Sequence, residues 1–151
     1  MKIKYSLSKK LKSQKVLELR KNCGSEDETE RMWQTAIEQS LCIASAFDSD
    51  KDNKLVGIGF VVGNNRHAQL VDLTVNPDYR KHGIGGKLFD MRVNFCRDNK
   101  ILYVGNTFDP KEPWLKDFYE KHGFRKIDFA MWLEDSVNLV SKNDKQGKGE
   151  L

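Results

Sequence analysis

Three glycines, Gly83, Gly85 and Gly86, stand close together directly before a stretch whose apolar residues recur at helical spacing. Glycine allows the backbone to approach a ligand closely and to turn its amide N–H groups inward. The first N–H groups of the following helix have no partner within that helix, and its positive dipole end adds to the same concavity. The segment from Arg80 to Gly86 therefore predicts an anion-binding site, with a tight turn that holds no ligand as the alternative.

Two nucleotide-binding patterns do not fit this loop. A P-loop requires GxxxxGK followed by Ser or Thr, whereas Gly86-Lys87 is followed by Leu88, and no glycine lies five residues before Gly86. A dinucleotide fingerprint requires GxGxxG, and the sixth position counted from Gly83 is again Leu88. The anion is therefore not expected to be a nucleotide bound in either of these two ways.

A more specific signal comes from two motifs taken together. The loop reads Arg80-Lys81-His82-Gly83-Ile84-Gly85 and is preceded by Val75-Asn76-Pro77-Asp78-Tyr79. Further along the chain stands Phe118-Tyr119-Glu120-Lys121-His122-Gly123-Phe124. In order and spacing, the two resemble the acyl-CoA loop and the FYxKxGF element of the GNAT N-acetyltransferase superfamily. The resemblance covers the chain from Met1 to about Leu133.

The resemblance implies an acetyl-CoA-dependent N-acetyltransferase that moves the acyl group directly to a primary amine. Acetyl-CoA would be the acyl donor, with the pyrophosphate of coenzyme A on the loop amides and the pantetheine arm beside the splayed strand before the loop. Where relatives often carry an asparagine before the tyrosine, this chain has Glu112, and Asn106 is expected to substitute. The residues expected to bind the cofactor are Leu73, Thr74, Val75, Arg80, Lys81, His82, Gly83, Ile84, Gly85, Gly86 and Asn106.

The catalytic residues are harder to assign than the cofactor loop. Tyr119 matches the tyrosine that protonates the departing thiolate in the family, although a core aromatic is the alternative. The positions where relatives often hold a titratable residue are Gln69 and Val71, and neither can take a proton. Asp72 is the nearest carboxylate, but strand alternation places it on the opposite face from Val71 unless a bulge intervenes. Deprotonation through water is the alternative, and His82 could contact phosphate.

These residues must be positioned by a series of short elements. Alternation predicts a first strand at Ile3–Leu7, and a hairpin of residues 55–62 and 68–75 follows later. Between them, a helix capped by Ser8 and a second helix starting at a capping box, Ser25 to Glu28, are expected, with an apolar stripe reaching Phe47. After the loop come a helix, a strand at 101–104, a helix at 113–122 and a strand at 124–133.

This order predicts an α/β fold with a central mixed sheet and helices on both faces. The resemblance implies that the sheet is mostly antiparallel, as in the GNAT-like acyl-CoA N-acyltransferase fold. With 151 residues the chain is the size of one domain, expected over residues 1–140, followed by a polar, flexible tail at 141–151. The edge strands of such a sheet leave a homodimer possible.

Composition limits the partners and the compartment. The sequence has no leader-like segment and no apolar run long enough to span a membrane, so a cytoplasmic protein without a membrane partner is expected. A formal charge of +4 without a dense basic stripe gives no reason to expect nucleic acid. Cys23, Cys42 and Cys96 are widely spaced and read as reduced structural thiols, and the acidic turn at 48–53 lacks the glycine and glutamate of a calcium loop, so no metal is expected.

Two readings of the function stay open at this point. The leading one is the acetyltransferase, whose acceptor could be a small-molecule amine or a protein amine. His67 and His122 are expected at the surface and outside the chemistry. The alternative is a catalytically silent module that binds coenzyme A, because Gln69 and Val71 supply no base.

Overall fold

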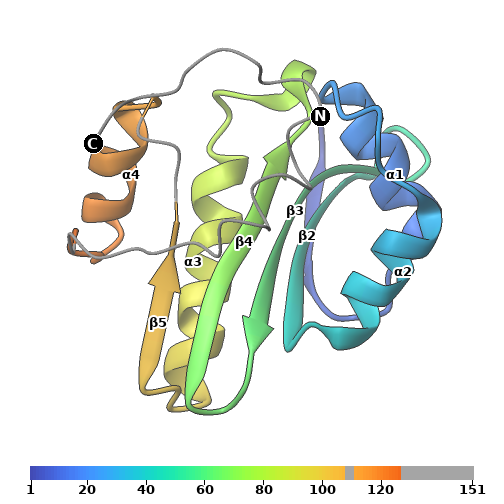
Figure 1. Cartoon of the computed structure of the whole chain (residues 1–151). Helices are drawn as coiled ribbons and strands as arrows, with labels where there is room; N and C mark the ends of the chain where they lie inside the picture. Colours follow the sequence, from blue (N-terminus) through green and yellow to red (C-terminus); the bar gives the residue numbers. More distant parts are fainter. Residues whose placement is uncertain (108–110, 127–151) are drawn as a thin grey trace, which may run out of the picture.

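The computed structural model describes residues 1–107 and 111–126, which form a five-stranded sheet with helices packed on it (Figure 1). The elements in chain order are β1 Ile3–Leu7, α1 Ser13–Asn22, α2 Glu30–Gln39, β2 Cys42–Asp48, β3 Lys54–Gly63, β4 His67–Val75, the short 3-10 helix η1 Pro77–Tyr79, α3 Ile84–Asp98, β5 Tyr103–Asn106 and α4 Trp114–Lys121. The strands lie in the order β1-β2-β3-β4-β5, and all neighbours are antiparallel except β4 and β5. The predicted mixed, mostly antiparallel α/β sheet is confirmed.

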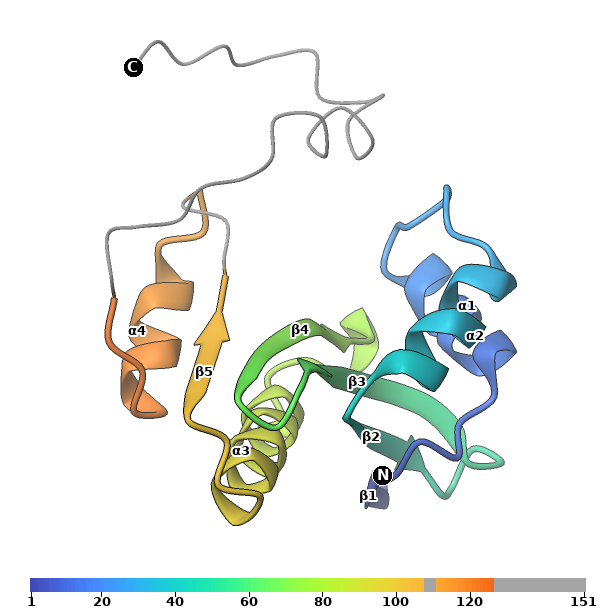
Figure 2. The same ribbon diagram turned by 60° about the horizontal axis from the view of Figure 1, so that its bottom comes forward.

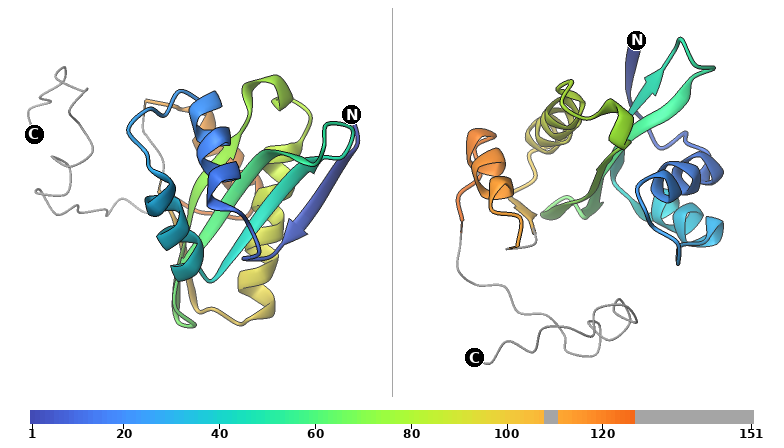
Figure 3. Two further views of the ribbon diagram at one scale, coloured as in Figure 1. Left: turned by 90° about the vertical axis from the view of Figure 1, so that its right-hand side faces the viewer. Right: turned by 90° about the horizontal axis from the view of Figure 1, so that it is seen from above.

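Helices cover both faces of this sheet, as predicted. α1 and α2 lie together on one face, and α3 lies on the other (Figure 2, Figure 3). α4 lies beside α3 at the β5 edge, on the side away from α1 and α2 (Figure 3). Within the residues described, no helix combines the length and the apolar character needed to cross a membrane.

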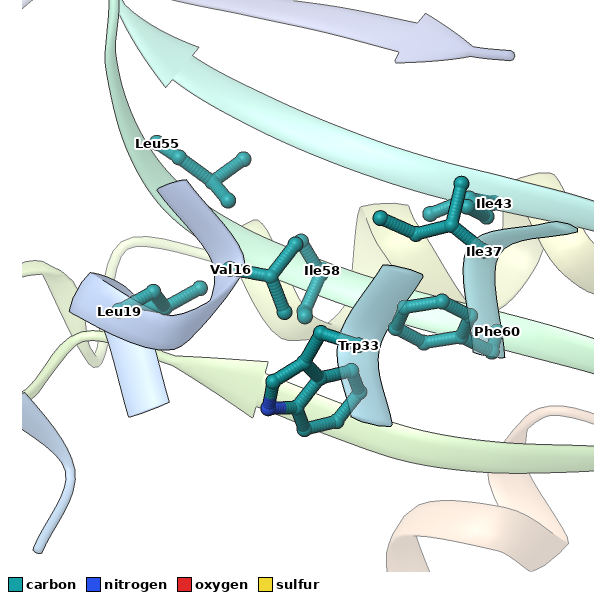
Figure 4. Packing of buried hydrophobic residues seen from close by; sticks show 8 residues of the cluster. All are labelled: Val16, Leu19, Trp33, Ile37, Ile43, Leu55, Ile58 and Phe60. Atoms are coloured by element: carbon teal, nitrogen blue, oxygen red, sulfur yellow. The ribbon is translucent and has the colours of Figure 1, made fainter. Parts of the chain in front are cut away.

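The core under α1 and α2 is built from large apolar side chains (Figure 4). Val16 and Leu19 of α1 and Trp33 of α2 are almost completely buried. The Trp33 ring lies with its centroid 5.5 Å from that of Phe60 on β3. Each such side chain stabilises the fold by about 1.5–3 kcal/mol when it is removed from water. This core fixes α1 and α2 over the middle of the sheet.

The core on the opposite face centres on Phe89 of α3. The Phe89 ring is fully buried. Its centroid lies 5.4 Å from the ring centroids of Phe118 and Tyr119, two aromatic residues of α4. Phe124, after α4, contacts the same ring at 5.3 Å. Aromatic pairs in this range attract one another beyond simple burial. Phe89 therefore holds α4, and with it Tyr119, against α3.

The predicted helix that reached Phe47 is wrong in its second half. α2 ends at Gln39, and Ser40 turns the chain into an extended conformation, with its hydroxyl donating to Ile37 O at 2.9 Å. The chain then forms β2, whose first five residues are all buried. A strand covered on both faces is apolar throughout, so its residues also fit a helical stripe, and spacing alone does not separate the two.

Both predicted helix starts are also displaced. α1 begins at Ser13 and not directly after Ser8. The N-cap of α2 is Thr29, whose hydroxyl accepts a backbone N–H at 3.3 Å, so the helix starts later than the capping box. Residues 25–28 are not helical, and the Glu28 carboxylate binds Arg20 and Trp33 as well as the Ser25 side chain.

The second half of the chain follows the prediction more closely. The hairpin of β3 and β4, the helix after the glycine loop and α4 form as expected, and Gly123 closes α4 with a φ of 86°. β5 begins at Tyr103, slightly later than predicted, because Ile101 packs into the core before the strand starts. The expected strand at 124–133 lies outside the described residues beyond 126, and 124–126 form no strand. The tail at 141–151 also lies outside them.

Candidate active site

The pairing between the two parallel strands covers only the first half of β4, because β5 ends there. β4 pairs with β5 from His67 to Leu70, where the pairing stops at Asn106. From Val71 to Val75, β4 has no strand beside it on this side among the residues described. Its other side stays paired with β3. The second half of β4 therefore has no neighbouring strand on this side, as the resemblance implied.

Backbone alternation identifies which backbone groups of this half of β4 face the gap beside it. The Asn76 N–H donates to Val56 O at 2.9 Å, across the β3–β4 pair. In an antiparallel strand alternate residues direct N–H and C=O to the same side, so Thr74 bonds towards β3 while Leu73 and Val75 face away from it. The carbonyl of Val75 accordingly accepts from Arg80 Nε at 3.1 Å. The N–H of Leu73 faces the side on which β5 has already ended.

A bulge interrupts β4 at Asp72. Thr74 lies opposite Ile58, but Val71 lies opposite Phe60, so β4 holds one residue more than β3 over this stretch. Asp72 has a φ of 52°, in the left-handed region that residues other than glycine rarely adopt. The bulge that would take Asp72 out of simple alternation is therefore present. Val71 packs with the core under α1 and α2.

The Asp72 carboxylate lies exposed at this bulge, and in the described part of the chain it accepts no hydrogen bond. Although the side chain reaches solvent, protein atoms around it partly desolvate it, and this raises the pKa of Asp72. The nearby cation of Arg20 acts in the opposite direction, Glu28 adds to the increase, and Arg92 opposes it. A carboxylate with a raised pKa is a stronger base than an ordinary aspartate.

An ion pair joins α1, the start of α2 and the free half of β4. Arg20 Nη2 lies 2.6 Å from Glu28 Oε1, and Arg20 Nη1 donates to Thr74 Oγ1 at 2.9 Å. The Trp33 indole N–H donates to the second Glu28 oxygen at 2.9 Å. The pair is about one-fifth exposed, so it lies at the wall of the site and not in the core. No pattern in the sequence indicated that these residues meet.

The glycine loop is fixed to the sheet before it begins. In η1, Tyr79 is buried and its hydroxyl donates to Asp48 Oδ2 at 2.8 Å. The Asn76 side chain accepts the Asp78 N–H at 3.0 Å and so closes the turn out of β4. Lys81 has a φ of 63° and His82 Nδ1 lies 2.7 Å from Arg80 O, which folds the basic stretch onto itself.

The glycines of the loop leave room for a ligand. Gly83 caps α3 with a φ of 75°, which explains why this position is glycine. At Gly85 an added Cβ would meet only Val75 Cγ2 at 3.7 Å, and at Gly86 only the His122 ring at 3.8 Å. These are ordinary contacts, so the fold itself does not demand glycine at the last two positions. Together with the free N–H groups that begin α3, they fit a pyrophosphate approaching the backbone.

Ile84 takes part in this loop only through its backbone. Its side chain is 2% exposed and packs in the core below the loop. Its assignment to the cofactor site therefore concerns its amide.

Tyr119 and Asn106 meet at one small open cavity between the end of β5 and α4. The Asn106 Nδ2 is buried and has no hydrogen-bond partner among the described residues. A buried donor without a partner is rare and suits a ligand that supplies an acceptor oxygen. Phe124 and Arg125 complete this part of the cavity wall. The geometry therefore brings together a tyrosine and an amide donor at the end of β5, where the pairing between β4 and β5 stops.

Comparison with known proteins decides the family. The model of the acetyltransferase (GNAT) domain matches residues 38–126. This chain belongs to the GNAT acetyltransferase family. It is thus an acetyl-CoA-dependent N-acetyltransferase by family, and both sequence motifs that carried the resemblance are accounted for. A search of curated protein sequences finds no match.

Solved structures agree with this assignment. A GNAT family acetyltransferase from Streptococcus pneumoniae superposes with a TM-score of 0.72 at 25% identity, covering 87% of this chain and 98% of the other. Glucosamine-6-phosphate N-acetyltransferase from Arabidopsis thaliana gives 0.69 at 16% identity, covering 88% and 98%. AAC(6')-Iy, solved with the bisubstrate analogue CoA-S-monomethyl-acetylneamine, gives 0.69 at 13%, covering 88% and 97%. The last two similarities concern the fold alone.

The histidines of this GNAT acetyltransferase divide into two kinds. His67 is exposed and stacks on Tyr103 with centroids 4.7 Å apart, as expected for a surface residue. His122 is half-buried, with its side chain 19% exposed, and its Nδ1 lies 2.6 Å from Asp90 Oδ1 on α3. The reason is that α4 turns this residue towards α3, where its ring packs on Phe89. His122 therefore joins the two helices beside Gly86.

Proposed function

We propose that this GNAT acetyltransferase moves an acetyl group from acetyl-CoA directly to a primary amine that lies between the α1–α2 layer and the free half of β4. One observation carries the proposal. The backbone of Leu73 and Val75 faces the side without a partner strand, directly before the glycine loop, while the Asp72 carboxylate projects at the bulge of the same strand. Donor and acceptor would then meet across a single strand, which holds the reacting groups close and oriented.

Acetyl-CoA, when bound, supplies an acyl group activated as a thioester. The amides of Gly83 to Gly86 would hold its pyrophosphate, with Arg80, Lys81 and His82 as neighbouring cations or donors. The backbone of Leu73, Thr74 and Val75 would bind the pantetheine arm, and Asn106 Nδ2 would donate to one of its carbonyl oxygens. The N–H of Leu73 is the donor proposed for the thioester carbonyl oxygen, where it would stabilise developing negative charge.

The acetyl transfer requires one group that accepts a proton and one group that donates a proton. The acyl carbon exchanges its bond to sulfur for a bond to nitrogen, so the amine must lose a proton and the thiolate must gain one. Asp72 is proposed to take the amine proton, directly or through water, since its raised pKa favours proton uptake. Tyr119 is proposed to protonate the thiolate, because it lines the cavity with Asn106.

The acceptor is proposed to be a small-molecule amine. The Arabidopsis neighbour is a glucosamine-6-phosphate N-acetyltransferase, and the wall formed by Arg20 and Glu28 carries both a cation and an anion. Such a wall suits an amine that also bears a polar or anionic group. A protein amine is the other acceptor class.

The decisive experiment measures thiol release from acetyl-CoA with a panel of amines: an amino sugar phosphate, a polyamine, an amino acid amide and a lysine peptide. The Tyr119→Phe variant removes only a hydroxyl and is expected to lower kcat about 10²-fold with little change in the KM for acetyl-CoA. Tyr103→Phe serves as the matched control, because Tyr103 is exposed on β5. Unchanged turnover in Tyr119→Phe would remove Tyr119 from the mechanism.

A silent module that binds coenzyme A is the second candidate, favoured by the absence of a titratable group at Gln69 and Val71. Calorimetry separates the two functions. Binding of coenzyme A without release of thiol towards any amine of the panel would support the module, and release that depends on the acceptor would support the enzyme.

A further inference from the structure

Arg92 is a positively charged residue buried beneath β3 and β4. It lies in the middle of α3, and only 1% of it is exposed. Its guanidinium lies directly over Gly59 of β3, where an added Cβ would come within 2.7 Å of both Cζ and Nε. Real Cβ contacts do not become that short, so any larger residue at position 59 would force the guanidinium to shift.

The hydrogen bonds of Arg92 span the bulge of β4. Its Nη1 donates to Phe60 O at 3.2 Å and to Val71 O at 3.1 Å, and its Nε donates to Leu88 O at 3.3 Å. Phe60 and Val71 are the last opposed pair before the register between β3 and β4 changes. One donor therefore bridges both strands at the point where the extra residue enters.

This bridge fixes the backbone that leads into Asp72. The carbonyl of Val71 belongs to the Val71–Asp72 peptide, which is planar, so fixing the oxygen also fixes the direction of the Asp72 N–H. The next backbone angle is the φ of 52° at Asp72, which lies in the left-handed region that residues other than glycine rarely adopt. Leu73, with its N–H facing the gap, follows directly. The orientation of both groups depends on this peptide.

The Arg92 guanidinium lies over the Phe89 ring, 5.3 Å from its centroid, but no acidic group in the described part of the chain neutralises it. No acidic side chain among the described residues forms a salt bridge with Arg92, and its Nη2 is buried without a partner. Burial lowers the pKa of Arg92 to about 10, because the charged form loses its hydration. An apolar side chain of similar size would fill the space against Phe89 and Cys96 without this penalty. The features that distinguish Arg92 from such a side chain are its charge and its hydrogen bonds to the bulge.

We propose that Arg92 is a positioning residue: by binding the carbonyls of Phe60 and Val71 it holds the β4 bulge in shape, and it thereby sets the direction of the Asp72 carboxylate and of the Leu73 amide. The effect on catalysis rests on the proposed function. The effect on the bulge does not, and it can be measured without turnover. Gly59 belongs to the same arrangement, because the absence of a side chain at this position leaves the space in which the Arg92 guanidinium lies.

The experiment uses the full chain and combines a structural and a kinetic measurement. Arg92→Met keeps the length of the side chain and removes the charge and the donors, whereas Arg92→Lys keeps the charge. Gly59→Ala displaces the guanidinium without removing it. Val93→Ala, on the same helix, is the control for ordinary loss of core packing, since Val93 is buried but does not contact the bulge carbonyls.

The structural measurement is amide hydrogen exchange, followed by NMR, at Thr74 and Asn76, whose N–H groups face β3 directly after the bulge. Exchange at these amides is expected to accelerate about tenfold or more in Arg92→Met and in Gly59→Ala, but not in Val93→Ala. The double variant Gly59→Ala/Arg92→Met should exchange no faster than Arg92→Met, since the two residues belong to one arrangement. Exchange in Arg92→Met equal to that of the parent would overturn the proposal, whatever the activity of the chain.

The kinetic measurement uses an amine that the parent acetylates. Arg92→Met is expected to lower kcat at least about tenfold with a small change in the KM for acetyl-CoA, and Arg92→Lys to restore part of it. The acid limb, the part of the pH–rate profile where activity falls at low pH, should also move to higher pH in Arg92→Met. The reason is that the Arg92 charge, with those of Arg20 and Glu28, influences the pKa of Asp72 and opposes its increase. Accelerated exchange with unchanged kcat would limit Arg92 to the fold and overturn its catalytic role. A parent without turnover would instead contradict the proposed function.

Discussion

Tyr79 and Asp48 form a buried hydrogen bond, with the phenol donating to Asp48 Oδ2 at 2.8 Å. Asp48 ends β2 and Tyr79 ends η1, so this contact fastens the entrance of the glycine loop to a central strand. Donation by Tyr79 is the main cause that holds the pKa of Asp48 below its ordinary value. The loop is thus positioned by the sheet before any ligand arrives.

Tyr79→Phe tests this link through stability. A depressed carboxylate pKa contributes stability that is present above the unfolded-state pKa, about 4, and is lost as pH falls through the lower folded-state pKa. The variant should therefore unfold at lower urea concentration at pH 7, and the difference from the parent should shrink below about pH 4. It should also raise the KM for acetyl-CoA, because the loop is less well held.

Tyr5→Phe is the control, because Tyr5 is 37% exposed and its hydroxyl forms no hydrogen bond among the described residues. A stability difference for Tyr79→Phe that is independent of pH would show that the hydroxyl does not act through the Asp48 charge.

The proposed role of Asp72 as the base predicts at which pH activity is lost on acidification. The carboxylate must be deprotonated to accept the amine proton, and desolvation raises the pKa of Asp72. Activity is therefore expected to be lost, as pH falls, above the range of an ordinary aspartate. Asp72→Asn should lower kcat by about 10²-fold or more and abolish the acid limb. Asp98→Asn, at the exposed end of α3, is the control. Persistence of the same limb in Asp72→Asn would assign it to another group, such as the amine itself.

Arg20 predicts a shift of the same limb in a known direction. Arg20 is the strongest charge that opposes the increase in the pKa of Asp72, so Arg20→Met should raise that pKa and move the limb to higher pH. The variant also breaks a partly buried pair with Glu28 and should cost about 1–2 kcal/mol of stability, between the values for surface and buried pairs. Glu28→Gln keeps similar packing but removes a negative charge, so it should move the limb the opposite way. Rate profiles of both variants with one amine test the signs.

The loop could be predicted from the sequence because its chemistry is local. The residues from Arg80 to Gly86 follow one another, and helix-start physics acts on neighbours. The contact of Arg20 with Thr74 could not be predicted in this way. It joins residues 54 positions apart, and it depends on α1 lying over the half of β4 that has no partner. A single sequence contains no periodic signal for such a meeting.

The bulge shows a second limit of prediction from spacing. Strict alternation from Leu70 would point the Asp72 side chain to the wrong face of the sheet. The positive φ of Asp72 cannot be recognised from the sequence, because the residue is not a glycine. Gly59 and Arg92 explain the shape of the bulge only when they are considered together, because neither residue alone indicates a bulge. The same limit hid β2, since buried residues such as Ile43 and Ala44 fit a helix and a strand equally well.

Gly83 and Gly85 predict opposite effects of the same substitution. Gly83 has a φ of 75°, so Gly83→Ala should cost about 1–2 kcal/mol of stability through backbone strain. Gly85 lies inside α3 with an added Cβ meeting only Val75 Cγ2 at 3.7 Å, so Gly85→Ala should leave the fold unchanged or stabilise it by up to about 1 kcal/mol. A pyrophosphate close to the loop would nevertheless clash with the new methyl group, at a cost of about 1–3 kcal/mol, or tenfold and more in Kd for coenzyme A. Thermal unfolding and calorimetry on the two variants separate these effects. Gly85→Ala binding coenzyme A as tightly as the parent would mean that the ligand does not approach the backbone at this glycine, and the assignment of the loop would then rest on Gly83 and Gly86 alone.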